Sequence, residues 1–238
     1  MADENVPVQR TTFTLRDYSR AVLRAWKALC GGYPSKESVG CLWAQYAHET
    51  GKGAFCWNNN IGNVKYSPGH DYMMLRGTWE IVAGKRVVFE PPHRATWFNA
   101  YASLDEAMRE HLQLLKEKRY ASSWPAIEAG LPGEFAVRLK TRGYYTAPVE
   151  EYARALRAHH QDYMRSNAYG GALQDIYDAM EDDTQPELAN PLSVPPPNAA
   201  TSPTTYPRPL PEEVTGSGPI LHPLSYPTGR GDPPDDAA

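Results

Sequence analysis

Glu49 is the side chain whose placement most clearly suggests chemistry. Counting back from it in steps of three and four residues gives an apolar helical stripe: Tyr46, Leu42 and Val39. Two glycines just beyond Glu49 predict that the helix ends there. The negative end of the helix dipole and the apolar neighbours both disfavour a charged carboxylate. The pattern therefore predicts a general acid, and the alternative is a glutamate that reaches solvent or pairs with Lys52.

An asparagine-rich segment follows this helix. It reads Asn58-Asn59-Asn60-Ile61-Gly62-Asn63-Val64-Lys65. The first three amides can donate hydrogen bonds to a sugar, and the alternative is a turn built on asparagine and glycine. Five aromatic residues can stack on sugar rings or fill the core: Trp57, Tyr66, Trp79, Trp97 and Tyr101.

Several short motifs recur in a fixed order over about residues 39–156. The Glu49-Thr50-Gly51-Lys52-Gly53 segment and the asparagine-rich segment come first. Three more follow: Phe98-Asn99-Ala100-Tyr101-Ala102-Ser103, Arg119-Tyr120 and Arg142-Gly143-Tyr144-Tyr145-Thr146-Ala147-Pro148. The ordered set resembles the glucosaminidase-domain family of bacterial cell-wall hydrolases (glycoside hydrolase family 73). The chain departs from the family pattern at Ala147, where aspartate is usual, and at Lys52, where an aromatic residue is common.

The resemblance implies a fold and a reaction. The fold is mainly α with some β structure: a lysozyme-like helical domain with a small β-hairpin lobe beside a glycan cleft. The reaction is hydrolysis of the β-1,4 bond on the reducing side of N-acetylglucosamine in peptidoglycan, with Glu49 as the general acid. Substrate contacts are expected from four residues: Asn59, Asn60, Asn63 and Tyr101.

The resemblance also implies a second carboxylate and a tyrosine in the site. Glu80 falls where the family's hairpin often places a carboxylate that activates water or stabilises an oxocarbenium-like transition state. A solvent-exposed strand residue is the alternative, Glu90 is a rival, and the substrate's own N-acetyl group can replace a second carboxylate. Tyr144 matches the family's active-site tyrosine and can hold the N-acetyl group or water; a core tyrosine is its alternative.

Caps and periodicity predict the elements that must position these residues. Helices are predicted after Thr14, Ser35 and Ser103 and over residues 133–142, 149–165 and 171–182. Residues 78–82 and 86–89 are rich in β-formers and are predicted to pair as a hairpin around Gly84 and Lys85.

Composition excludes several other classes of protein. The chain of 238 residues has a net charge of -4, so it lacks the basic footprint of a nucleic-acid binder. It contains no apolar run of about 18 residues, so no membrane span is expected. Three cysteines without C-x-x-C spacing argue against a disulfide framework. The seven histidines show no H-E-x-x-H spacing, and we expect neither a metal nor a cofactor.

The chain divides into three parts by composition. Residues 1–13 are predicted to be a flexible N-terminus, and residues 14–182 the glucosaminidase-like domain. Residues 183–238 hold most of the 22 prolines and few large apolar side chains, so we expect a disordered tail. This tail is a candidate contact for a secretion-system, phage or immunity partner.

Two other functions remain open from the sequence. A lytic transglycosylase uses a similar single glutamate but forms an anhydro product. A catalytically weak glycan-binding or structural module of a phage or secretion system belongs to another class. Since the N-terminus lacks the apolar segment of a signal peptide, we expect synthesis in the cytoplasm and action on the cell wall after non-Sec export or lysis.

Overall fold

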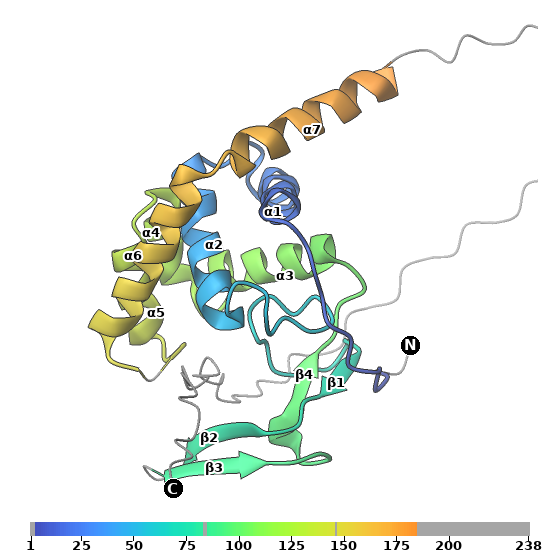
Figure 1. Cartoon of the computed structure of the whole chain (residues 1–238), viewed down its shortest axis with the longest axis vertical. Helices are drawn as coiled ribbons and strands as arrows, with labels where there is room; N and C mark the ends of the chain where they lie inside the picture. The colour runs from blue at the N-terminus through green and yellow to red at the C-terminus, as the bar shows by residue number, and fades with distance from the viewer. Residues whose placement is uncertain (1–2, 83–84, 146, 185–238) are drawn as a thin grey trace, which may run out of the picture.

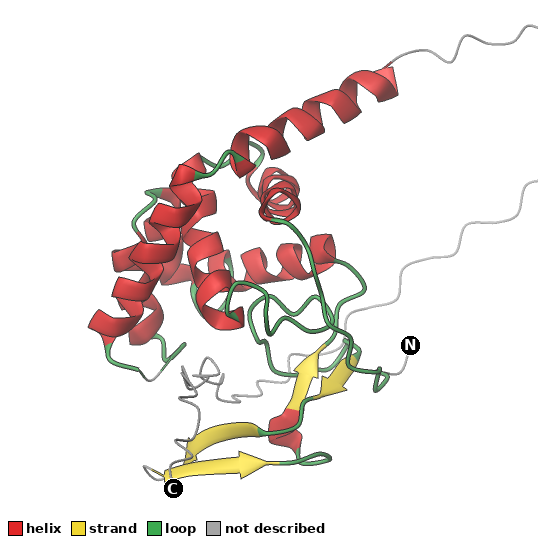
Figure 2. Cartoon of the chain, viewed as in Figure 1, coloured by secondary structure: helices red, strands yellow, loops and turns green. Residues whose placement is uncertain are grey.

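The computed structural model describes residues 3–82, 85–145 and 147–184, without the side chains of residues 80–82, 183 and 184. The α-helices are α1 (Leu15–Cys30), α2 (Lys36–Thr50), α3 (Leu104–Lys116), α4 (Trp124–Glu128), α5 (Pro132–Thr141), α6 (Val149–Arg165) and α7 (Ala168–Thr184). The strands are β1 (Tyr72–Met74), β2 (Thr78–Val82), β3 (Lys85–Phe89) and β4 (Trp97–Asn99). Short 3-10 turns lie at Arg94–Thr96 and Ala121–Ser123. A helical body with a small β lobe confirms the predicted fold class (Figures 1 and 2).

The first two helices begin and end where their capping residues predict. At the start of α1, the Thr14 hydroxyl accepts from the Asp17 amide at 3.1 Å, and the Asp17 carboxylate accepts from the Thr14 amide at 3.0 Å. At the start of α2, the Ser35 hydroxyl accepts from the Ser38 amide at 3.1 Å. Gly51 ends α2 with φ +57°, a left-handed conformation that glycine adopts at little cost.

The core lies between the helices. α2 packs against α6, α1 against α3 and α7, and α5 against α6. Gly40 permits the close approach of α2 to α6, because a Cβ atom there would lie 2.9 Å from the His160 ring. The largest fully buried apolar side chains include Leu23, Leu42, Met108, Leu112, Leu115 and Phe135. Burial of a side chain of this size stabilises a fold by about 1.5–3 kcal/mol.

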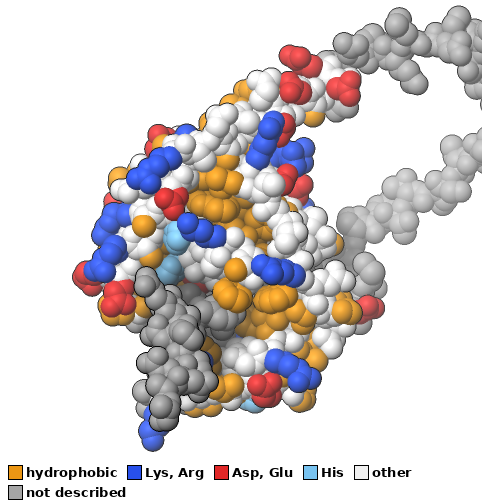
Figure 3. All heavy atoms as spheres, viewed as in Figure 1, with side chains coloured by type: hydrophobic (Ala, Val, Ile, Leu, Met, Phe, Trp, Pro, Cys, Tyr) orange, Lys and Arg blue, Asp and Glu red, His pale blue; other side chains and the backbone are white. Residues whose placement is uncertain are grey.

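Aromatic side chains fill the junction between α1 and α2. The Tyr18 and Tyr46 rings stack with centroids 5.0 Å apart, and Phe13 and Trp43 lie against this pair. Figure 3 shows hydrophobic side chains gathered between α1 and α2, with lysines and arginines spread around them. The contact with Phe13 joins the chain before α1 to the helical body.

The β lobe consists of two antiparallel pairs. In the first, β1 pairs with β4, with Tyr72 opposite Asn99. In the second, β2 pairs with β3, with Thr78 opposite Phe89. This second pair confirms the predicted hairpin, although β3 begins one residue earlier than expected.

The N-terminal segment, which we expected to be flexible over residues 1–13, runs as an extended strap along the β lobe over residues 3–13. Backbone hydrogen bonds join Val6 to Tyr72 at 2.8 Å and Thr11 to Cys56 at 3.0 Å. The Asn58 amide also donates to the Pro7 carbonyl at 3.0 Å. The strap therefore connects β1 to the asparagine-rich loop that follows α2.

The C-terminal region is described only as far as α7. This helix packs against α1 through a small cluster of Leu23, Ala172 and Ile176 and ends at Thr184. The predicted tail of residues 183–238 lies outside the described residues from residue 185 onward. Among the helices that the structure describes, none is both long and apolar enough to span a bilayer.

Candidate active site

Glu49 lies in the last turn of α2, and its side chain is buried, with 2% exposed. The Tyr152 hydroxyl donates a hydrogen bond to Glu49 Oε1 at 2.8 Å. The Asn63 amide donates to the Glu49 backbone carbonyl at 2.9 Å, which satisfies one of the free carbonyls at the helix end. Three separate segments therefore meet at Glu49: α2 itself, α6 and the loop after α2.

The environment of Glu49 favours its protonated form. Burial raises the pKa of Glu49 to about 8, while hydrogen bonding by Tyr152 and Asn63 opposes this rise. The carboxyl group is therefore mostly protonated at neutral pH, which is the state that a general acid requires. The direction of this shift agrees with the sequence argument from the helix end and its apolar neighbours.

Tyr152 is held on two sides. Its ring stacks on Tyr145 with centroids 3.7 Å apart and an interplanar angle of 9°. The His48 ring meets it edge-on at 4.7 Å. Sequence analysis did not identify Tyr152 as a site residue. The sequence does place Tyr152 on the apolar face of a helix, and a buried tyrosine hydroxyl usually has a hydrogen-bond partner.

Tyr144 lies close enough to Glu49 for their charges to interact. Burial, and then the charge of Glu49, raise the pKa of Tyr144 well above its usual range. The Tyr144 hydroxyl donates to the Gly62 carbonyl at 3.3 Å, and its ring meets Tyr120 edge-on at 5.0 Å. The Tyr144 hydroxyl is thus directed at the loop after α2, the same loop whose Asn63 binds the Glu49 backbone.

The asparagines of this loop make structural hydrogen bonds. Asn60 is 1% exposed, and its Nδ2 donates to the carbonyls of Val64 and Asn99, both at 2.9 Å. Asn59 donates to the Tyr101 carbonyl at 2.8 Å. Asn58, Asn59 and Asn63 adopt positive φ angles, which asparagine tolerates better than most residues. These amides therefore hold the loop in shape, and their contact with sugar remains a prediction.

The aromatic residues suggested for sugar stacking do not form one platform. Tyr101 is 6% exposed, and its hydroxyl accepts from Asn99. Trp97 stacks on Tyr72 with centroids 4.4 Å apart, and Tyr66 lies beside both rings. Two more lie apart from this cluster: Trp57 packs under the β1–β4 pair and Trp79 lies beneath Arg86.

The two hairpin glutamates occupy different positions. Glu80 lies on β2 opposite Val87, and its side chain is outside the described part of the structure. Glu90 follows β3, is exposed, and accepts from the Gly77 amide at 3.2 Å. The identity of a second catalytic carboxylate therefore remains a prediction.

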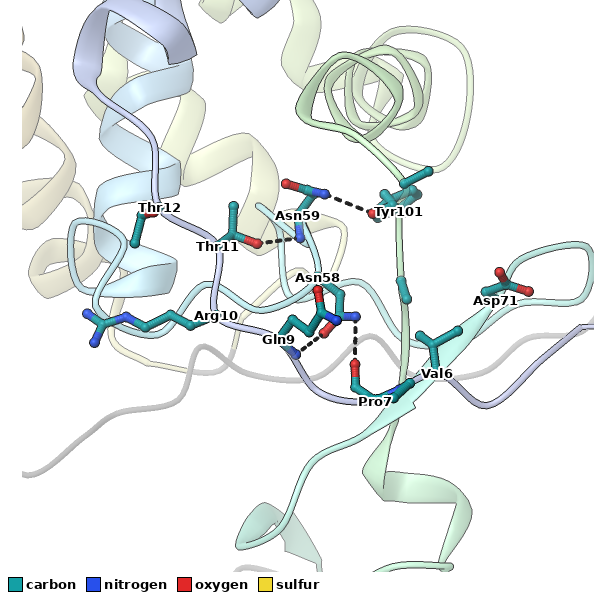
Figure 4. Close-up of a pocket in the computed structure, with 12 residues that line it drawn as sticks. Val6, Pro7, Gln9, Arg10, Thr11, Thr12, Asn58, Asn59, Asp71 and Tyr101 are labelled. Atoms are coloured by element: carbon teal, nitrogen blue, oxygen red, sulfur yellow. Dashed lines mark hydrogen bonds between the residues drawn. The ribbon is translucent and has the colours of Figure 1, made fainter.

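A cavity of about 570 Å³ lies beside the strap and does not include Glu49 among its lining residues. It is lined from the strap side by residues such as Gln9 and Thr11, and from the loop side by Asn58 and Asn59 (Figure 4). Figure 4 also shows that hydrogen bonds between strap and loop cross this region. Among the described residues, no group of three or more histidine, cysteine or acidic side chains is placed to hold a metal ion.

Comparison with known proteins identifies two similar solved structures. No protein-family model and no curated protein matches the chain. The glycoside hydrolase domain from Salmonella typhimurium FlgJ is 22% identical, covers 72% of this chain and 99% of its own, and has a TM-score of 0.42. The catalytic domain of the autolysin Auto from Listeria monocytogenes is 18% identical, covers 68% and 90%, and has a TM-score of 0.44. Likenesses this distant leave the roles of individual residues to be tested on this chain.

Proposed function

We propose that this protein is a glycoside hydrolase that cleaves peptidoglycan at the β-1,4 bond after N-acetylglucosamine. The observation that carries the proposal is the buried carboxyl group of Glu49 at the end of α2, with its pKa raised to about 8. The ordered motifs between residues 39 and 156 support the choice of a peptidoglycan glycan strand as substrate. No cofactor is part of the proposal.

The proposed reaction begins with proton transfer from Glu49. The protonated carboxyl donates to the glycosidic oxygen as the bond to the sugar breaks, and an oxocarbenium-like centre develops on that sugar. Water then attacks this centre, activated by Glu80 or Glu90 or following assistance from the N-acetyl group. A donor must come within about 2.6–3.2 Å of the oxygen that it protonates, so glycan binding has to open access to the buried Glu49 side chain.

Glu49→Gln tests the proposal directly. Glutamine keeps the size of the side chain but has no acidic proton, so cleavage should fall by at least about 10²–10⁴-fold. The measurement is release of soluble fragments from purified cell wall by the folded variant. Glu37→Gln is the matched control, since Glu37 lies exposed in the first turn of the same helix and should retain activity. Turnover by Glu49→Gln close to that of the parent would remove Glu49 from the mechanism.

A lytic transglycosylase is the second candidate. This reaction needs a single glutamate as general acid, and the buried carboxyl group of Glu49 fits that requirement. Mass spectrometry of the released fragments separates the two reactions, because hydrolysis adds water whereas transglycosylation leaves an anhydro sugar. A non-catalytic glycan-binding module would bind the wall but release no fragments in the same assay.

A further inference from the structure

We infer that Tyr152 is a positioning residue for Glu49: its hydroxyl holds Oε1, so that Oε2 carries the proton toward the glycosidic oxygen. This inference rests on the proposed function for its catalytic consequence. The orientation of the carboxyl group, however, can be measured without any substrate. Tyr152 acts through Glu49 and makes no proposed contact with the glycan.

The Tyr152 hydroxyl contacts the carboxyl group of Glu49 directly. Both residues are buried, and the hydroxyl lies 2.8 Å from Oε1, a normal length for an O–H···O hydrogen bond. A protonated carboxyl group has one oxygen that accepts and one that carries hydrogen. Because the Tyr152 hydroxyl donates to Oε1, the acidic proton belongs on Oε2.

Two aromatic neighbours hold the Tyr152 ring in place. It lies between the face of Tyr145 and the edge of His48, so the ring cannot rotate away without breaking an aromatic contact on either side. Aromatic pairs of this kind contribute about 0.5–1.5 kcal/mol beyond area burial. The hydroxyl is therefore presented to Glu49 from a fixed direction, which is what orientation of a catalytic group requires.

The titratable side chains near Glu49 determine whether its titration can be read separately. Burial lowers the pKa of His48, on α2, to about 4, so this ring is neutral at pH 7. Behind it on α6, His159 also has a lowered pKa because of its burial. The pKa values of Tyr152 and of Tyr144, just before α6, are both raised well above their usual range, mainly by burial. None of these four described side chains therefore changes its charge while Glu49 titrates, and the Tyr152 hydroxyl stabilises the ionised carboxylate.

Tyr152→Phe removes the hydroxyl and keeps the ring in its stack. We expect the pKa of Glu49 to rise further, measured from carboxyl ¹³C shifts in protein labelled at glutamate. We also expect the rate constant kcat to fall by about tenfold or more with little change in KM, because a misoriented acid acts mainly on the transition state. The alkaline limb of the pH profile should move to higher pH, since activity requires protonated Glu49.

Tyr163→Phe is the matched control. Tyr163 lies on the same helix, is fully buried, and its hydroxyl is 2.8 Å from Ser19 Oγ rather than from Glu49. This variant also loses a buried tyrosine hydroxyl from α6, so its thermal stability should fall to a similar extent. The Glu49 titration and the alkaline limb should stay unchanged. An equal shift in both variants would mean that Tyr152 has only a structural role and would overturn the inference.

A measurement on the wild-type chain tests the inference even if the Tyr152→Phe variant does not fold. In protein labelled with ¹³Cζ-tyrosine, the Tyr152 signal should shift as Glu49 ionises, and the Tyr163 signal should not. A Tyr152 signal that does not shift as Glu49 ionises would overturn the inference. If Glu49→Gln remains active while these shifts are seen, the orientation holds and the proposed function fails, so the two failures are distinguishable.

Discussion

The proton that burial keeps on Glu49 links the proposed catalysis to the stability of the fold. Glu49 has an ordinary pKa of 4.5 when exposed to water and a pKa of about 8 in the folded chain. Between these values the folded state holds a proton that the unfolded state releases. Stability should therefore fall as pH rises through this range, by roughly 1.4 kcal/mol for each pKa unit at most.

Glu49→Gln should remove this pH dependence. The melting temperature of the variant minus that of the wild type should be higher at pH 8 than at pH 5 by roughly 10 °C at most, because each kcal/mol shifts the melting temperature of a domain of this size by about 2–4 °C. Thermal unfolding followed by circular dichroism at the two pH values measures the difference. If the gap between the two proteins is the same at both pH values, Glu49 is not held protonated and the general-acid assignment loses its physical basis.

At the scale of elements, the helical body and the β lobe carry different residues of the candidate site. α2 and α6 together hold Glu49 and Tyr152, and both helices belong to the main core. The strap of residues 3–13 and the asparagine-rich loop are joined by hydrogen bonds, such as that from the Asn59 amide to Thr11 Oγ1 at 2.7 Å. The two candidates for the second carboxylate lie on β2 and directly after β3, so substitutions there test the proposed mechanism.

Single alanine substitutions in the hairpin should identify that carboxylate. If Glu80 positions the attacking water, Glu80→Ala should lower kcat strongly with little change in KM, because the contact forms mainly in the transition state. Glu90→Ala, at the base of the hairpin, should retain most of the activity. Steady-state kinetics on purified wall fragments provide the measurement. The reverse result would assign the role to Glu90, and two active variants would favour assistance by the N-acetyl group.

At the scale of the whole molecule, the described residues form a helical body with a β lobe, and a proline-rich sequence follows them from residue 185 onward. The domain ends with α7, which projects from the body beside α1 (Figure 1). The Asp175 carboxylate on α7 binds Arg16 and Arg20 on α1, which fastens the helix near its middle.

Truncation after Thr184 tests this division. The tail has too few large apolar residues to build a core, so the shortened chain should keep its melting temperature within about 4 °C and its cleavage rate unchanged. Differential scanning calorimetry and wall digestion of both chains provide the measurements. A larger drop in melting temperature would mean that the tail packs on the domain.

The sequence by itself determined those features that depend on residues three or four positions apart. The Thr14–Asp17 capping box, the Ser35 cap and the end of α2 just after Glu49 all follow from local hydrogen bonds and backbone preferences. The direction of the Glu49 pKa shift was also predicted from the apolar stripe, although its cause in the folded chain is burial, which depends on packing as well. The β2–β3 hairpin was similarly predictable from β-forming residues on either side of a glycine turn.

Only the tertiary structure decided what surrounds these local features. Tyr152 meets Glu49 across 103 positions of sequence, because α6 packs against α2, and no periodic pattern encodes such a pair. The hydrogen bond from Asn60 to the Asn99 carbonyl also joins separate segments. The path of the strap over residues 3–13 likewise depends on its bonds to β1 and to the loop after α2. Such side-chain partners depend on how separate elements pack, and packing is decided by the fit of the whole core rather than by any one segment.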